Sequence, residues 1–131
     1  MFHPLRKSGL TLIELLIAVF VLSVGIASAL LFFSQAMVTT QYAGDLTVAT
    51  THAECVLEEM QSRNTLFNII STNWPDWAQK EELTTLPEET LGVYFPNPSK
   101  NPLDIQLTLS WVRNSRPYNI TLTTAITRYE D

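Results

Sequence analysis

Hydrophobic and polar residues follow three successive patterns along this chain. The first is a long apolar stretch, because residues 15–33 carry no charged side chain and are interrupted only by Ser23, Gly25 and Ser28. At about 1.5 Å per residue, a helix over this stretch crosses most of a hydrocarbon layer that is about 30 Å thick. The first pattern therefore predicts a membrane-spanning helix near the N-terminus.

The second pattern is an apolar stripe with helical spacing. No proline occurs between Leu5 and Trp74, so we expect one helix that continues to about Ser62, with weaker helical propensity around Gly44. Its second half is amphipathic and is suited to pack on a sheet. The stripe comprises Leu46, Ala49, Ala53, Val56, Leu57 and Met60, whereas His52, Glu58, Glu59 and Arg63 are expected mostly on the other faces.

The third pattern is the two-residue alternation of β-strands. Apolar residues alternate with polar ones over 105–111 and again over 118–126, on either side of a turn at 114–117, which predicts an antiparallel hairpin. Before it we expect an irregular segment after Asn64, a short helix from Pro75 to about Leu83, a short strand over 91–95 and a proline-rich loop over 96–102. The predicted fold class is α+β, with a long N-terminal helix packed on an antiparallel sheet of three or four strands.

Composition excludes several classes of function. From Asp45 onward the chain holds twelve acidic and six basic residues, which argues against binding to a nucleic-acid backbone. Cys55 is the one cysteine, so no internal disulfide can form, and we assign it and the separated His3 and His52 to structural roles. We find no pattern of metal ligands, no nucleophile paired with a base and no phosphate-binding glycine loop, so no metal, cofactor or catalysis is predicted.

Glu14 stands at the start of the apolar stretch, where a carboxylate costs about 2.5–3.5 kcal/mol on insertion scales. A carboxylate in this position needs a cationic partner, and the apolar stretch that follows it contains none. Arg6 and Lys7 precede the stretch, and the next base is Arg63. The positive-inside rule then predicts a cytoplasmic N-terminus and an exported C-terminal part.

The order of Arg6, Lys7, Gly9, Leu10, Thr11-Leu12-Ile13 and Glu14 resembles the N-terminal signature of type IV prepilins and of the pseudopilins of type II secretion. The resemblance implies cleavage after Gly9 by an aspartic prepilin peptidase, followed by N-methylation of Leu10. It also implies that the new amine of Leu10 pairs with Glu14 of a neighbouring subunit. Two departures are a leucine at position 10, where phenylalanine is usual, and the absence of a helix proline.

The resemblance further implies a division into a leader (residues 1–9), a membrane and assembly helix (10–34) and an exported domain (35–131) whose amphipathic helix runs to about residue 63. The expected location is the bacterial inner membrane, followed by a pilus or pseudopilus. The expected partners are other pilin or pseudopilin subunits, the prepilin peptidase and N-methyltransferase, an inner-membrane assembly platform, and membrane lipid before assembly.

Less specific features of the sequence favour a PilV-type minor pilin or an I-type pseudopilin within a tip or priming complex. These are the small exported domain, the lack of paired cysteines, the segment over 53–60 and the terminal hairpin with Trp111. Three alternatives stay open: a major filament-forming pilin, an unrelated single-pass anchor that presents a binding domain, and a secretory signal peptide cut after Ala27-Ser28-Ala29.

Overall fold

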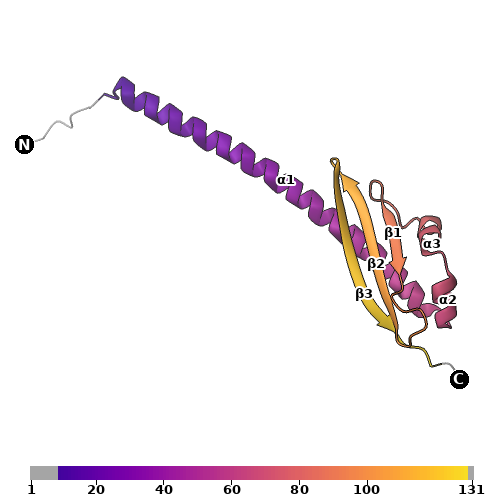
Figure 1. Ribbon diagram of the computed structural model, residues 1–131. Coiled ribbons are helices and arrows are strands. Elements are labelled where there is room, and N and C mark those ends of the chain that lie inside the picture. The colour runs from indigo at the N-terminus through magenta and orange to yellow at the C-terminus, as the bar shows by residue number, and fades with distance from the viewer. Residues whose placement is uncertain (1–8, 130–131) are drawn as a thin grey trace, which may run out of the picture. The chain divides into compact units, whose positions relative to one another are not determined.

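The computed structural model describes residues 9–129. A long helix precedes two short helices and a three-stranded antiparallel sheet, which confirms the predicted α+β class (Figure 1). The chain divides into two compact units, one ending at Gln41 and one beginning at Tyr42. The elements are α1 (Leu12–Ser62), α2 (Leu66–Ser71), α3 (Trp74–Lys80), β1 (Thr90–Tyr94), β2 (Leu103–Arg113) and β3 (Arg116–Ile126).

The first unit contains the N-terminal part of α1, and every residue from Gly9 to Gly44 is exposed. The hydroxyl groups of Ser23 and Ser28 find hydrogen-bond acceptors within the helix. Each donates a hydrogen bond to the backbone carbonyl four residues earlier, at 2.7 and 2.8 Å. The helix runs unbroken past Gly44 to Ser62, which confirms its predicted end.

In the second unit β2 is the central strand, with β1 and β3 on its two sides. The β2–β3 turn consists of Asn114 and Ser115, whose φ angles are 52° and 61°. Positive φ at both positions is typical of the two-residue turn that matches the twist of a hairpin. The turn is therefore shorter than predicted, and Arg116 and Pro117 begin β3, an edge strand where a proline is tolerated.

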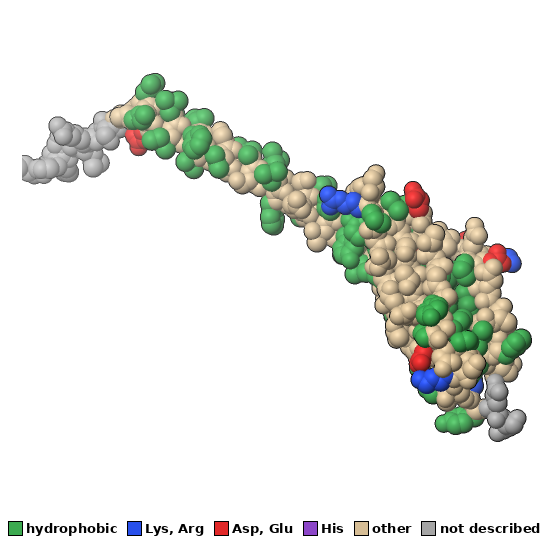
Figure 2. Space-filling model, viewed as in Figure 1, with side chains coloured by type: hydrophobic (Ala, Val, Ile, Leu, Met, Phe, Trp, Pro, Cys, Tyr) green, Lys and Arg blue, Asp and Glu red, His purple; other side chains and the backbone are tan. Residues whose placement is uncertain are grey.

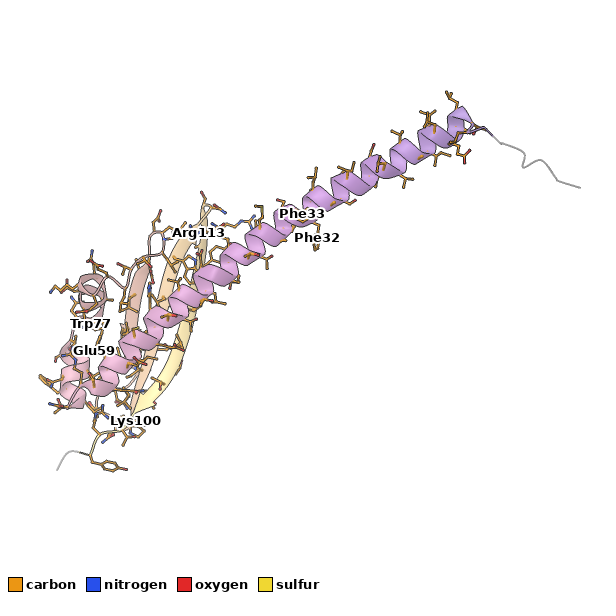
Figure 3. All side chains as sticks on the ribbon, turned by 180° about the vertical axis from the view of Figure 1, so that it is seen from behind. Phe32, Phe33, Glu59, Trp77, Lys100 and Arg113 are labelled. Atoms are coloured by element: carbon orange, nitrogen blue, oxygen red, sulfur yellow. The ribbon has the colours of Figure 1, made fainter. Side chains whose placement is uncertain are left out.

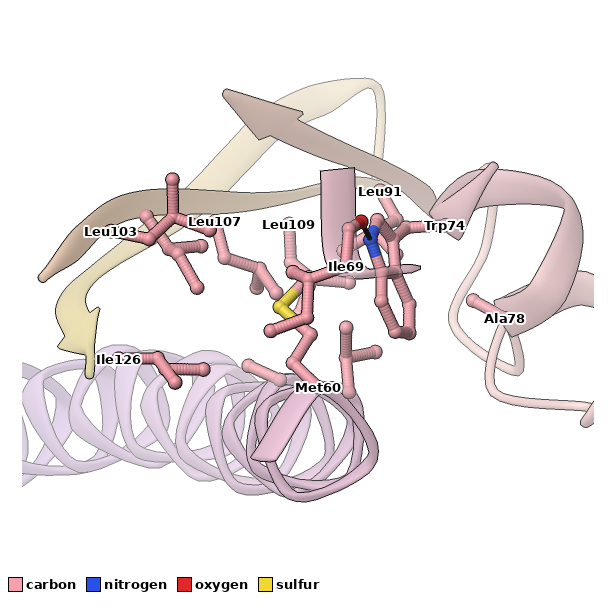
Figure 4. Packing of buried hydrophobic residues seen from close by; sticks show 12 residues of the cluster. Met60, Ile69, Trp74, Ala78, Leu91, Leu103, Leu107, Leu109 and Ile126 are labelled. Carbon is pink, nitrogen blue, oxygen red and sulfur yellow. Dashed lines mark hydrogen bonds between the residues drawn. The ribbon is translucent and has the colours of Figure 1, made fainter. Parts of the chain in front are cut away.

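The core lies between the second half of α1, the short helices and the inner face of the sheet (Figure 4). Met60 of α1 is fully buried and lies in one cluster with Ile69 of α2 and Leu107 of β2. Trp74 is also buried, and its indole N–H donates a 2.8 Å hydrogen bond to the carbonyl of Ile69. These contacts fasten α2 and α3 to the core.

Three details differ from the prediction. Helix α2 occupies a segment that we expected to be irregular, where Thr65 caps it by accepting a 3.2 Å hydrogen bond from the backbone N–H of Asn68. Helix α3 ends at Lys80 instead of Leu83. His52 faces the core with only 8% of its surface exposed, because Glu89 supplies a buried polar partner for its ring.

Candidate functional site

The N-terminal end of α1 carries three of the residues that the sequence singled out, Gly9, Leu10 and Glu14. Thr11 caps this end: its Oγ1 accepts a hydrogen bond from the backbone N–H of Glu14 at 3.3 Å, and its carbonyl accepts one from Leu15 at 3.1 Å. The helix therefore begins at Leu12, directly after its Thr11 cap. Arg6, Lys7 and His3, which the sequence analysis also named, lie outside the described residues.

Glu14 lies in the first turn of α1 and is exposed. An anion is favoured there by the helix dipole, whose positive end is at the N-terminus. Within residues 9–129, no ion pair and no hydrogen bond of the Glu14 carboxylate is found, and the next charged residue along the helix is Asp45. The carboxylate is thus an isolated charge at the end of a thirty-residue uncharged segment, residues 15–44.

The surface that follows Glu14 is predominantly apolar. Figure 2 shows hydrophobic side chains distributed along the N-terminal part of α1, and Phe32 and Phe33, labelled in Figure 3, project from it. Helix α1 is long and apolar enough to cross a membrane by length and composition. So large an exposed apolar surface marks a segment that contacts lipid or other protein chains rather than water.

A second arrangement joins α1 to the closed end of the hairpin, within the second unit. Arg113 donates two hydrogen bonds to Asp45, from Nε to Oδ2 at 2.8 Å and from Nη2 to Oδ1 at 2.7 Å. Tyr118 lies beside both Tyr42 and Trp111, with ring centroids 5.1 and 5.9 Å away. We call these five residues the hairpin-end cluster; Arg113 is labelled in Figure 3.

The ion pair in the hairpin-end cluster changes the acidity of both partners. Hydrogen bonding from Arg113 lowers the pKa of the Asp45 carboxyl; burial opposes this, while the charge of Arg113 adds to the lowering. The same hydrogen bonding raises the pKa of Arg113. Asp45 therefore stays ionised at neutral pH although only 6% of its surface is exposed.

A further polar pair fixes the loop before β1 to α1. The carboxylate of Glu89 is fully buried, lies 2.7 Å from His52 Nδ1 and accepts a 2.9 Å hydrogen bond from the backbone N–H of Leu86. The role of this pair is structural, because both oxygens of the carboxylate have partners within the fold. Across residues 9–129, no group of three His, Cys, Asp or Glu side chains could hold a metal ion.

The C-terminal end of α1 has no basic residue of its own in its last turn. Arg128, which follows β3, supplies one: its guanidinium donates to the carbonyls of Gln61 and Arg63, the latter at 3.2 Å. A cation at this end of a helix interacts favourably with the dipole and satisfies carbonyls that lack a partner. Neither this contact nor the Asp45–Arg113 pair was predicted, since the partners lie 65 or more residues apart in the chain.

Comparison with known proteins agrees with the N-terminal geometry. Residues 4–30 match the family model described as the prokaryotic N-terminal methylation motif. No curated protein and no solved structure matches the chain significantly. The motif, together with the apolar helix and the small antiparallel sheet, supports the class of pilin-type structural subunits and is consistent with the fold of type IV pilin-like proteins. The motif does not distinguish a minor pilin, a major pilin and a pseudopilin from one another.

Proposed function

We propose that this chain is a minor pilin or a pseudopilin. It is cleaved after Gly9, N-methylated at Leu10 and assembled into the tip or priming complex of a type IV pilus or of a type II secretion pseudopilus. The observation that carries the proposal is the isolated carboxylate of Glu14, at the start of an exposed and otherwise uncharged apolar helix segment. The proposed segments are the leader (residues 1–9), the membrane and assembly helix (10–34) and the exported domain (35–131).

Cleavage after Gly9 turns the backbone nitrogen of Leu10 into a cation. This amine precedes the Thr11 cap and so lies at the positive end of the helix dipole, where a cation is unfavourable without a nearby anion. Glu14 of a neighbouring subunit supplies that anion. Each charge is costly alone in an apolar surrounding, and pairing the two charges offsets much of that cost.

The charges of the leader and the apolar surface of α1 account for the proposed topology and partners. Arg6 and Lys7 hold the leader on the cytoplasmic side of the inner membrane, where the prepilin peptidase and N-methyltransferase act on it. Lipid covers the apolar part of α1 before assembly. An inner-membrane assembly platform and other pilin or pseudopilin subunits receive the chain afterwards and replace lipid around the helix.

Two other functions compete with this proposal. A major pilin has the same processed N-terminus but dominates the protein content of sheared filaments, so abundance in that fraction separates it from a minor subunit. An unrelated single-pass anchor keeps Met1 and does not enter filaments. The small second unit and the single cysteine, Cys55, favour the minor subunit.

Processing is tested with Gly9→Val and the matched control Gly25→Val. A Cβ atom added at either glycine meets no other atom within 4 Å, so both positions have room for the start of a side chain. We expect Gly9→Val to accumulate with its leader attached, because the peptidase cleft must accept a side chain where glycine has none. Gly25→Val should be processed like the wild type. Normal cleavage of Gly9→Val would contradict the assigned processing site.

Assembly is tested with Glu14→Gln, which removes the charge and keeps the shape. The control is Glu54→Gln, at an exposed position of α1 in the second unit. We expect Glu14→Gln to insert into the membrane normally but to enter sheared filaments about tenfold less, since the Leu10 amine then lacks an anionic partner. Equal incorporation of both variants would count against the proposed pairing.

A further inference from the structure

Strand β3 forms an open edge of the sheet. It pairs with β2 alone among the described residues, and its exposed positions include Asn119, Thr121, Thr123 and Ala125. The opposite edge differs, because β1 is only five residues long and α3 lies against it (Figure 1). The two edges of this sheet are therefore protected to very different degrees.

The register shows which backbone groups of β3 point away from the sheet. In a hairpin closed by a two-residue turn, the pair next to the turn, here Arg113 and Arg116, is hydrogen-bonded. Non-hydrogen-bonded and hydrogen-bonded pairs then alternate along the two strands. The 3.1 Å contact between the hydroxyls of Thr108 and Thr121 fits the closer approach of such a non-hydrogen-bonded pair. Outward-facing N–H and C=O groups therefore belong to Asn119, Thr121, Thr123 and Ala125.

The side chains along this edge do not protect it. Natural edge strands usually carry charges, prolines or bulges that prevent another strand from pairing with them. In β3 such features lie at the two ends, with Arg116 and Pro117 before the segment and Arg128 after it. Residues 118–127 hold no charge and no proline, and β-branched Thr and Ile fill six of these ten positions.

We propose that the 119–125 edge of β3 is an assembly surface that adds an extended, uncharged strand from a different pilin-like subunit; this inference rests on the proposed function. The occupant follows from the chemistry of the edge. Backbone donors and acceptors that repeat at every second residue fit an extended backbone, and an uncharged edge gives a charged strand no compensating partner.

Antiparallel pairing with the β3 strand of a second copy of this chain does not fit the edge. Antiparallel pairing of β3 with β3 places a two-fold axis perpendicular to the sheet. Because the 42–62 part of α1 packs on the inner face of the sheet, this axis makes the two copies of α1 run in opposite directions. Two chains that enter one membrane through this same helix cannot adopt that arrangement.

The test uses the full-length chain in cells that assemble the filament. Thr123→Pro removes an outward N–H that makes no bond to β2, whereas Thr123→Val keeps this donor and changes only the side chain. We expect Thr123→Pro to reduce incorporation into sheared filaments about tenfold and Thr123→Val to leave it unchanged. Incorporation of both variants at the wild-type level overturns the inference.

A cross-linking measurement covers the case in which Thr123→Pro does not fold. In a Cys55→Ala background, Thr121→Cys places a thiol on the edge, and Gln106→Cys places one on the same face of the central strand. We expect strong cross-links to a different pilin-like subunit from position 121 and weak ones from position 106. Equal cross-linking from both positions, or cross-links between two copies of this chain through position 121, overturns the inference.

The outcomes also separate the inference from the proposed function. If the wild-type chain keeps its leader and stays out of filaments, the proposed function fails and the inference fails with it. If the wild-type chain is processed and incorporated while the edge variants behave like it, only the inference fails.

Discussion

Replacing Asp45 with asparagine should destabilise the second unit by about 2 kcal/mol. The change removes the negative charge that receives both hydrogen bonds of Arg113 and leaves the size of the side chain nearly unchanged. The site matters for the fold because Asp45 lies on α1 and Arg113 lies at the end of β2, so this pair holds the hairpin against the helix.

The magnitude follows from the exposure of the two side chains. A hydrogen bond to a charged group contributes about 1.5–3 kcal/mol, and Asp45 accepts two of them while its side chain is only 9% exposed. The side chain of Arg113 is 29% exposed, so solvent screens the pair, and asparagine still offers one acceptor. These corrections reduce the sum to about 2 kcal/mol, which lowers the Tm of a unit of this size by about 8–16 °C.

The assay is thermal unfolding of the second unit, which begins at Tyr42, followed by the fluorescence of its tryptophans. The matched control is Asp76→Asn, which makes the same chemical change in an exposed pair where Asp76 lies 2.8 Å from Lys80. We expect the control to change the Tm little, because exposed ion pairs contribute little to stability.

The pH dependence gives the prediction a definite sign. The pKa of Asp45 is lower in the folded state than in the unfolded state, so its contribution is fully present above the ordinary pKa of about 3.9 and is lost as the pH falls through the lower folded value. The difference in Tm between the wild type and Asp45→Asn should therefore shrink on acidification below about pH 4. Equal effects of Asp45→Asn and Asp76→Asn at neutral pH would refute this reasoning.

Three further predictions concern the second unit, and each is read from the same unfolding assay. Ser115→Gly should stabilise it by about 0.5–1 kcal/mol, because Ser115 has a φ of 61° that glycine adopts without strain; a lower Tm would speak against the assigned turn. Met60→Ala should cost about 2–5 kcal/mol by leaving a cavity in the core, whereas Glu58→Ala at an exposed position should change little. Arg128→Ala should lower the Tm by removing the cation from the C-terminal end of α1, and an unchanged Tm would show that the contact is not stabilising.

Local patterns were sufficient to predict most of the architecture. The absence of proline before Trp74 and the stripe ending at Met60 predicted one helix to Ser62, and alternation predicted both strands of the hairpin. Helix α2 was missed because six residues are too short to show a helical period. The threonine at its N-cap, Thr65, was the signal that could have indicated it.

Contacts between distant segments could not be predicted in the same way. His52 was expected on an outer face, since a titratable side chain is buried only with a partner, and Glu89 lies 37 residues further along the chain. The residues proposed for processing and assembly, Gly9, Leu10 and Glu14, came from the resemblance of residues 6–14 to the prepilin signature, and Glu14 also from its position at the start of the apolar stretch. In the proposed function their pattern is local, because a peptidase and a neighbouring subunit, rather than the fold of this chain, are proposed to act on them.

The central claim is that processing creates the cation that Glu14 needs. Mass spectrometry of the intact wild-type chain, taken from sheared filaments, tests it most directly. We predict a single species that begins at Leu10 and carries one added methyl group on its terminal nitrogen. A species that still begins at Met1, or one that begins at Leu30 after cleavage by a secretory signal peptidase, would contradict the account.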